Sequence, residues 1–328
     1  MSELQIGLLA IGALVVVGVL AYNRIQERGA KRSAERAFRS SHADVLLDAP
    51  AMEPASESVR GSHRPVRLPA TRVPEPDAAI DYIVEFSSDQ AAAQATIHEQ
   101  WAAIARRHAP RALLGAAPDG KSWRAGLQLV SRDGAVGEAD LIEFRSAVET
   151  LAASVGATVA APEMRAAVDA ARTLDDFCAD ADIQVVVHVQ GGPFAGTKIR
   201  ATAEAGGLTL ENDGKFSLRN DDQQLLYTLA ARNGAAFTAA GMKEAAPAAL
   251  TLALDVARTP DTRRSFESMT RLAHQLAAVL GGSMVDDNGN SLDERAIGAI
   301  AQQLDTVRAQ LEARGVPPGG PAALRLFS

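Results

Sequence analysis

The residues of this chain that could perform chemistry begin with a glycine-rich stretch, Gly191–Lys198, which reads Gly-Gly-Pro-Phe-Ala-Gly-Thr-Lys. It follows a predicted strand and opens a predicted helix, as a phosphate-binding P-loop does. A P-loop needs Lys directly after its second Gly, with Ser or Thr next to hold magnesium. Here Thr197 precedes Lys198, and Pro193 interrupts the loop. We therefore interpret the stretch as a turn between a strand and a helix, not as a nucleotide site.

A second stretch, Asp286–Asn290, resembles a fragment of a calcium-binding loop. Its glycine stands one position early, and no Glu closes the loop at the required spacing. A turn before a helix is the favoured interpretation. The histidines show no pairing typical of metal ligands; they are His42, His63, His98, His108, His188 and His274. We expect no metal site and no cofactor.

Nucleophilic catalysis is also disfavoured. The sequence contains no Gly-x-Ser-x-Gly nucleophile elbow. His188 has no evident carboxylate and nucleophile partners, so a binding contact or an ordinary surface position is favoured over catalysis for it. We expect a protein that is not an enzyme and has no small-molecule substrate.

The composition narrows the function classes further. The chain has 328 residues, which is enough for about two domains of ~150 residues. Its net charge of −7 argues against a nucleic-acid binder. The single cysteine, Cys178, excludes an internal disulfide and fits a reducing compartment. We expect it to be a small buried hydrophobic residue rather than a reactive thiol.

The elements that must position any site are strands of a half-open sheet. Ile183–Val189 is aliphatic at every odd position, whereas Gln184, Val186 and His188 occupy the even ones. A strand buried on both faces would be apolar throughout. Leu250–Val256 alternates in the same way. The pattern predicts an α+β fold whose antiparallel sheet is backed by helices on one face and open on the other.

The open face is where the function is expected. Small and apolar side chains rimmed by polar groups on an uncovered surface are typical of a partner site, and such a groove can take an amphipathic peptide. A plain solvated sheet is the alternative. The predicted partner-binding residues are Gln184, Val186, His188, Tyr227, Leu229, Ala231, Thr251 and Ala253.

Two parts of the chain resemble one another. Leu127–Leu129 matches Leu252–Leu254, and Leu151–Gly156 matches Leu276–Gly281, both at an offset of 125 residues. The opening strands correspond at an offset of 103, so the second copy holds 22 more residues between its strands. That is enough for about two extra strands of ~5 residues and their turns.

These matches predict the domain boundaries. We expect a truncated first α+β copy at 78–181, a complete domain at 182–315 and a disordered tail at 316–328. In the first copy, Asp81, Ile83 and Glu85 would form an acidic open face that repels an acidic peptide. The first copy is therefore predicted to be a spacer or to bind something else.

The N-terminal part is typical of a membrane anchor. Leu4–Tyr22 contains no charge and would span ~28 Å as a helix, close to the ~30 Å of a bilayer core. Basic residues follow the run, which argues against a cleaved signal peptide and places residues 1–3 outside and the bulk in the cytoplasm. Residues 23–40 would lie near anionic lipid. The Pro-rich stretch at 41–77 is expected to be a flexible linker.

The order of these parts resembles the ZipA family of bacterial cell-division proteins: an anchor, a basic segment, a Pro-rich tether and a C-terminal α+β domain. In the C-terminal part, the resemblance is strongest at a glycine-containing segment that leads into the last helix. The motifs that carry it are Val185–Val189, Gly196, Ile199, Ala205–Gly206, Leu250–Val256 and, above all, Gly281–Asp287.

The resemblance implies a function. ZipA family members tether FtsZ, the tubulin-like division protein, to the inner membrane, and their C-terminal domain binds the FtsZ C-terminal tail on its exposed sheet face. It also implies a single-pass protein of the bacterial inner membrane. Family grooves carry bulkier apolar side chains than Ala231 and Ala253 of this chain. The alternative function is a membrane-tethered sensor that binds a small ligand between the two copies.

Overall fold

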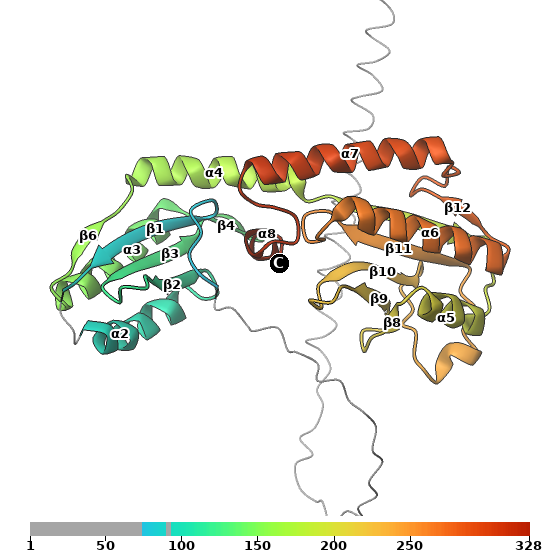
Figure 1. The fold of residues 1–328 in the computed structure, drawn as a ribbon, viewed down its shortest axis with the longest axis horizontal. Helices are drawn as coiled ribbons and strands as arrows, with labels where there is room; N and C mark the ends of the chain where they lie inside the picture. Colours follow the sequence, from blue (N-terminus) through green and yellow to red (C-terminus); the bar gives the residue numbers. More distant parts are fainter. Residues whose placement is uncertain (1–73, 90–92) are drawn as a thin grey trace, which may run out of the picture. The chain divides into compact units, whose positions relative to one another are not determined.

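The computed structural model describes residues 74–89 and 93–328, which belong to one compact unit. The predicted membrane helix Leu4–Tyr22, the basic segment and the linker up to residue 73 lie outside the described residues. Within the described part of the chain, no helix is both long and apolar enough to cross a membrane. We name residues 74–181 the first lobe, residues 182–316 the second lobe, and residues 317–328 the C-terminal segment (Figure 1).

The first lobe is built on a four-stranded antiparallel sheet in the order β2-β3-β1-β6. Side chains of Tyr82, Val84 and Phe86 alternate into the core because successive residues of a strand point to opposite faces. The elements are β1 (Asp81–Ser87), α2 (Ala93–Arg107), β2 (Ala112–Ala116), β3 (Ser122–Gln128), β4 (Val130–Ser131), β5 (Gly134–Ala135), α3 (Glu138–Ser154), β6 (Thr158–Ala160) and α4 (Met164–Ala181).

The second lobe is built on a six-stranded antiparallel sheet in the order β12-β7-β11-β10-β9-β8. Helix α6 packs against four of its strands, and Figure 1 shows it lying across the sheet. The elements are β7 (Gln184–Gln190), α5 (Gly196–Ala205), β8 (Thr209–Leu210), β9 (Phe216–Arg219), β10 (Leu225–Ala231), the 3-10 turn η1 (Gly241–Lys243), β11 (Ala249–Asp255), α6 (Thr262–Leu280), β12 (Ser283–Val285) and α7 (Glu294–Ala313).

The helices that back the two sheets follow from apolar stripes. Leu141 and Phe144 of α3 and Phe266 and Met269 of α6 are fully buried, at positions spaced to share one helix face. Helix α6 ends at Gly281, whose φ of 71° lies in the left-handed region that glycine adopts without strain.

The two sheets have the same strand order apart from one edge. The order is β6-β1-β3-β2 in the first lobe and β12-β7-β11-β10 in the second. In each lobe the first strand lies beside the last strand. Strands β8 and β9 extend the second sheet beyond β10, where the longer spacing predicted two additional strands.

Two sequence-based expectations are wrong. The tail at 316–328 is not disordered: it contains α8 (Pro321–Leu326), and Val316 and Ala323 are fully buried against the rest of the chain. The flexible linker does not run to residue 77, because Pro76 is buried. Helix α7 is capped by Asp293, whose carboxylate accepts the Ala296 N–H at 2.8 Å.

Candidate partner-binding face

The candidate site is the side of the second sheet that faces away from α6, which we name the outer face. Strand β11 lies between β7 and β10, so its register decides which side chains share a face. Ala253 and Thr251 of β11 lie opposite Val186 and His188 of β7, respectively. Residues directly opposite in an antiparallel pair lie on the same side of the sheet. The structure therefore brings these four predicted residues together on one face, as the sequence predicted.

Burial along β11 alternates in step with this assignment. Leu250, Leu252 and Leu254 are fully buried under α6, whereas Thr251 and Ala253 are half-exposed. Val186 is also half-exposed, and Gln184 at the start of β7 is exposed. The outer face is thus accessible at its centre, and it offers small apolar and hydroxyl groups there.

Strand β10 contradicts the prediction. Tyr227 and Leu229 are only 1% and 0% exposed and Ala231 is 4% exposed, because they point toward α6. Tyr227 reaches that helix through a 3.3 Å hydrogen bond between its hydroxyl and the hydroxyl of Ser268. All three belong to the core and not to the outer face.

The β10 residues on the outer face are Thr228 and Ala230, which the sequence analysis missed. Thr228 pairs with Ala253 and Ala230 with Thr251, and both are half-exposed. A signal for this was present in the sequence. The large apolar residues of β10 alternate with Thr228 and Ala230, and the rule that placed the leucines of β11 inside also places those large residues inside.

His188 is held more firmly than a surface position would be. It is 4% exposed, its Nδ1 lies 2.9 Å from the Thr251 hydroxyl, and its Nε2 lies 2.7 Å from the Asp287 carboxylate. An ionised carboxylate only accepts, so Nε2–H donates to Asp287, and the Thr251 hydroxyl lies within hydrogen-bond distance of Nδ1. The expectation that His188 lacks a carboxylate partner is therefore wrong. Asp287 was hidden because it follows β12, whose pairing with β7 only the fold shows.

This row of acid, imidazole and hydroxyl does not form a catalytic site. Thr251 lies in the middle of β11, a strand that is paired on both sides by β7 and β10. Backbone N–H groups in a ladder are already engaged and cannot serve as an oxyanion hole, on which acyl transfer depends. The hydrogen bonds instead orient the ring, so that His188 forms a fixed wall of the outer face.

The charged groups of the outer face lie at its ends. Asp255, opposite Gln184, is half-buried, and burial raises the pKa of its carboxyl above the usual value, partly offset by the Arg258 N–H that donates to it at 3.0 Å. Asp287 lies at the β12 edge. The centre of the face is uncharged, which suits apolar side chains of a peptide.

The comparison with known families decides which kind of domain this is. Residues 182–303 match the family described as ZipA, C-terminal FtsZ-binding domain. These residues are similar to that domain. No curated protein matches the chain.

The match to the ZipA domain runs from the start of β7 into α7 and so includes the whole outer face. It confirms the resemblance drawn from the sequence and shows a protein-binding domain of cell division, not an enzyme family. The first lobe lies outside the matched residues.

The turn at Asp286–Asn290 in the ZipA domain closes on itself, as the sequence predicted. The Asp286 carboxylate accepts the backbone N–H groups of Asn288 and Asn290 at 2.9 and 2.8 Å. The Asn290 amide and these N–H groups hold the pKa of Asp286 below its usual value. Within residues 74–89 and 93–328, no group of three acidic, His or Cys side chains is arranged to hold a metal ion.

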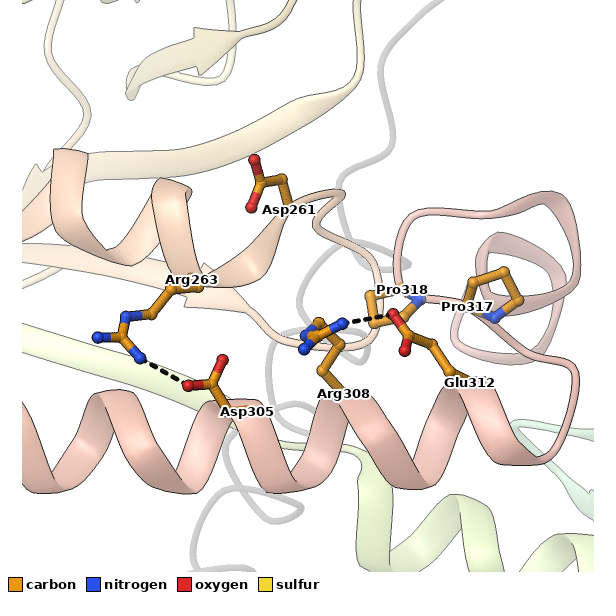
Figure 2. Close-up of a pocket in the computed structure, with 7 residues that line it drawn as sticks. All are labelled: Asp261, Arg263, Asp305, Arg308, Glu312, Pro317 and Pro318. Atoms are coloured by element: carbon orange, nitrogen blue, oxygen red, sulfur yellow. Dashed lines mark hydrogen bonds and ion pairs between the residues drawn. The ribbon is translucent and has the colours of Figure 1, made fainter.

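A cavity of about 360 Å³ beside the ZipA domain's last two long helices offers no better site (Figure 2). Its arginines are already paired: Arg263 with Asp305 at 2.6 Å and Arg308 with Glu312 at 2.8 Å. An incoming anion would have to displace these carboxylates. The cavity gives no support to the small-ligand sensor that the sequence left open.

Proposed function

We propose that the ZipA domain binds the C-terminal tail of FtsZ on its outer face, between β7, β11 and β10. The observation that carries this proposal is the alternation along β11, which leaves Thr251 and Ala253 accessible while the opposite side is packed under α6. An accessible sheet face with an uncharged centre and polar ends is a surface on which a peptide can bury apolar side chains. On this proposal the face comprises Gln184, Val186, His188, Thr228, Ala230, Thr251 and Ala253.

The cellular role follows from adding the N-terminal segment. A chain that holds FtsZ at one end and crosses the inner membrane through Leu4–Tyr22 would tether the division ring to the membrane. The charge-free run and the basic residues after it support this arrangement, with residues 1–3 periplasmic and the bulk cytoplasmic. The full chain should then sediment with membranes after a high-salt wash, whereas the segment from residue 74 onward should not.

We also propose that the first lobe is a truncated copy of the ZipA domain. The sequence matches at a constant offset and the shared strand order of the two sheets support this. The copy lacks equivalents of β8 and β9.

The test of FtsZ binding is a titration of the chain with a synthetic FtsZ C-terminal peptide, followed by calorimetry. Val186→Glu places a carboxylate at the centre of the face, where the peptide would have to desolvate it. That costs several kcal/mol, which corresponds to at least a ~100-fold weaker Kd. The matched control is Val279→Glu on α6, because Val279 is 48% exposed on an element behind the sheet.

The two variants should differ only in binding. Both should keep the circular dichroism of the wild type, because neither position is in the core. Val186→Glu should lose the heat of peptide binding and Val279→Glu should keep it. Equal affinity for the two variants would place the tail elsewhere, and no heat with the wild-type chain would refute the proposal as a whole.

A further inference from the structure

The C-terminal segment is bound to the sheet of the first lobe. The Arg325 guanidinium donates to both oxygens of the Asp81 carboxylate, at 2.9 and 2.7 Å. The Gln128 side-chain amide donates to the Arg325 carbonyl at 3.2 Å. Asp81 and Gln128 are opposite one another on β1 and β3, so both contacts lie on one side of that sheet.

This is the side that the sequence predicted to be an open, acidic face. It is neither. Asp81 is 5% and Ile83 8% exposed, and Glu85 lies 3.5 Å from Arg124 on the neighbouring strand. The charges are matched, and the face is covered at Asp81 and Ile83, whereas Glu85 is exposed.

The covering has two parts. Toward the middle of the face, Pro76 lies so close to Gly126 that a Cβ there would come within 2.7 Å of the proline Cβ. At the end of the face marked by Asp81, the cover is α8. The helix buries Ala323 and Leu326, which are 0% and 4% exposed.

The place that α8 occupies corresponds to the candidate FtsZ face of the second lobe. By the offsets of 103 and 125 residues, Asp81 aligns with Gln184 and Gln128 with Ala253. The strand order is shared, but Asp81 pairs with Gln128 whereas Gln184 pairs with Asp255. This two-residue difference in register keeps the aligned residues on the same side of each sheet. A short helix therefore lies on the first lobe where a peptide is proposed to lie on the second.

The segment has the properties of a ligand rather than of an independent element. Helix α8 has six residues, too few to be stable by itself in water, so its helical form depends on the surface that receives it. It is joined to the second lobe by a Pro-Pro-Gly-Gly turn, where Gly319 donates to the Ala257 carbonyl at 2.9 Å.

The Asp81 carboxylate defines what the surface selects. The Asp81 side chain is 0% and the Arg325 side chain 17% exposed. A buried carboxylate needs a partner that satisfies both oxygens, and the planar guanidinium does this with two parallel bonds, which an ammonium cannot.

We propose that the first lobe is a second peptide-binding domain, occupied in cis by the chain's own C-terminal segment. The ligand class is a short peptide helix that presents small apolar residues and an arginine to Asp81. The C-terminal segment competes with any such peptide. A peptide can therefore bind the first lobe only after α8 is released. This goes beyond FtsZ binding by the second lobe and does not depend on it.

The probe for the test is a fluorescent synthetic peptide of residues 316–328, added to the full chain in detergent and followed by anisotropy. The wild-type chain should bind it weakly, because α8 occupies the site. Arg325→Gln removes the cis contact and should lower the Kd for the probe at least tenfold. Adding Asp81→Asn to that chain should abolish the gain, and a probe in which Arg325 is replaced by Gln should not bind.

Two controls keep the outcome decisive. Trp101 and Trp123 lie in the first lobe, so their fluorescence reports whether Arg325→Gln leaves that lobe folded. If it does not, Arg325→Lys keeps the charge but loses the bidentate geometry, and it should give a smaller gain in the same direction. Probe binding should also survive Val186→Glu. If the folded Arg325→Gln or Arg325→Lys chain binds the probe no better than the wild type, α8 is a fixed structural element and the proposal is wrong.

Discussion

Neighbouring residues of β10 give the sharpest test of how the outer face is built. Leu229 is fully buried in the core, between Phe216 on β9 and Leu252 on β11. Thr228, one residue earlier, is half-exposed on the opposite side. A register shifted by one residue would exchange these roles.

The magnitude follows from burial. Leu229→Ala removes the equivalent of about three buried methylene groups at ~0.8 kcal/mol each, and the cavity left behind adds to this. We expect a loss of about 3 kcal/mol in the free energy of unfolding of the second lobe. Thr228→Glu should cost about 1 kcal/mol or less, because the new side chain reaches solvent.

Hydrogen exchange at the backbone amides of β11 measures this in the second lobe alone. A loss of about 3 kcal/mol corresponds to roughly a hundredfold faster exchange through opening. Leu229→Ala should show that acceleration and keep its affinity for the FtsZ peptide, whereas Thr228→Glu should show the reverse. If Leu229→Ala left exchange unchanged and Thr228→Glu accelerated it, the assignment of the two faces of β10 would be wrong.

Two further predictions concern the first lobe. Gly126→Ala should lower the free energy of unfolding of this lobe by about 1–2 kcal/mol, because the added methyl group meets Pro76. Adding Pro76→Gly to the same chain should recover part of that loss in a urea titration. If the effects of the two substitutions were simply additive, the contact would be contradicted. Burial, with a smaller contribution from Asp175 and Asp182, raises the pKa of the Cys178 thiol to about 11. At pH 8 the alkylation of Cys178 by iodoacetamide should be about a hundredfold slower than in the urea-unfolded chain, since each pKa unit is a tenfold change in the thiolate fraction. Equal rates in the two states would refute the shielding of this half-buried thiol.

Local patterns in the sequence were enough for much of the fold. The alternation of β7 and β11 placed Val186 and Ala253 on one face, because a strand's side chains alternate whatever it pairs with. The stripe of α6 and its glycine end were readable for the same reason: they depend on residues within a few turns of one another. The short strands β2, β6 and β12 were missed, because three to five residues carry too little pattern.

What the sequence by itself determined is therefore the set of longer strands and helices, the sides that β7 and β11 turn inward, and the similarity of residues 182–303 to the ZipA C-terminal domain. Only the tertiary structure decided that Asp287 holds His188 and that Arg325 meets Asp81 across 244 residues of chain. Such contacts depend on which distant segments bury the most surface against each other when the whole chain folds. No local pattern of charge or hydrophobicity encodes that choice, which is why a tail rich in Pro and Gly could be expected to be disordered and yet carry a buried helix.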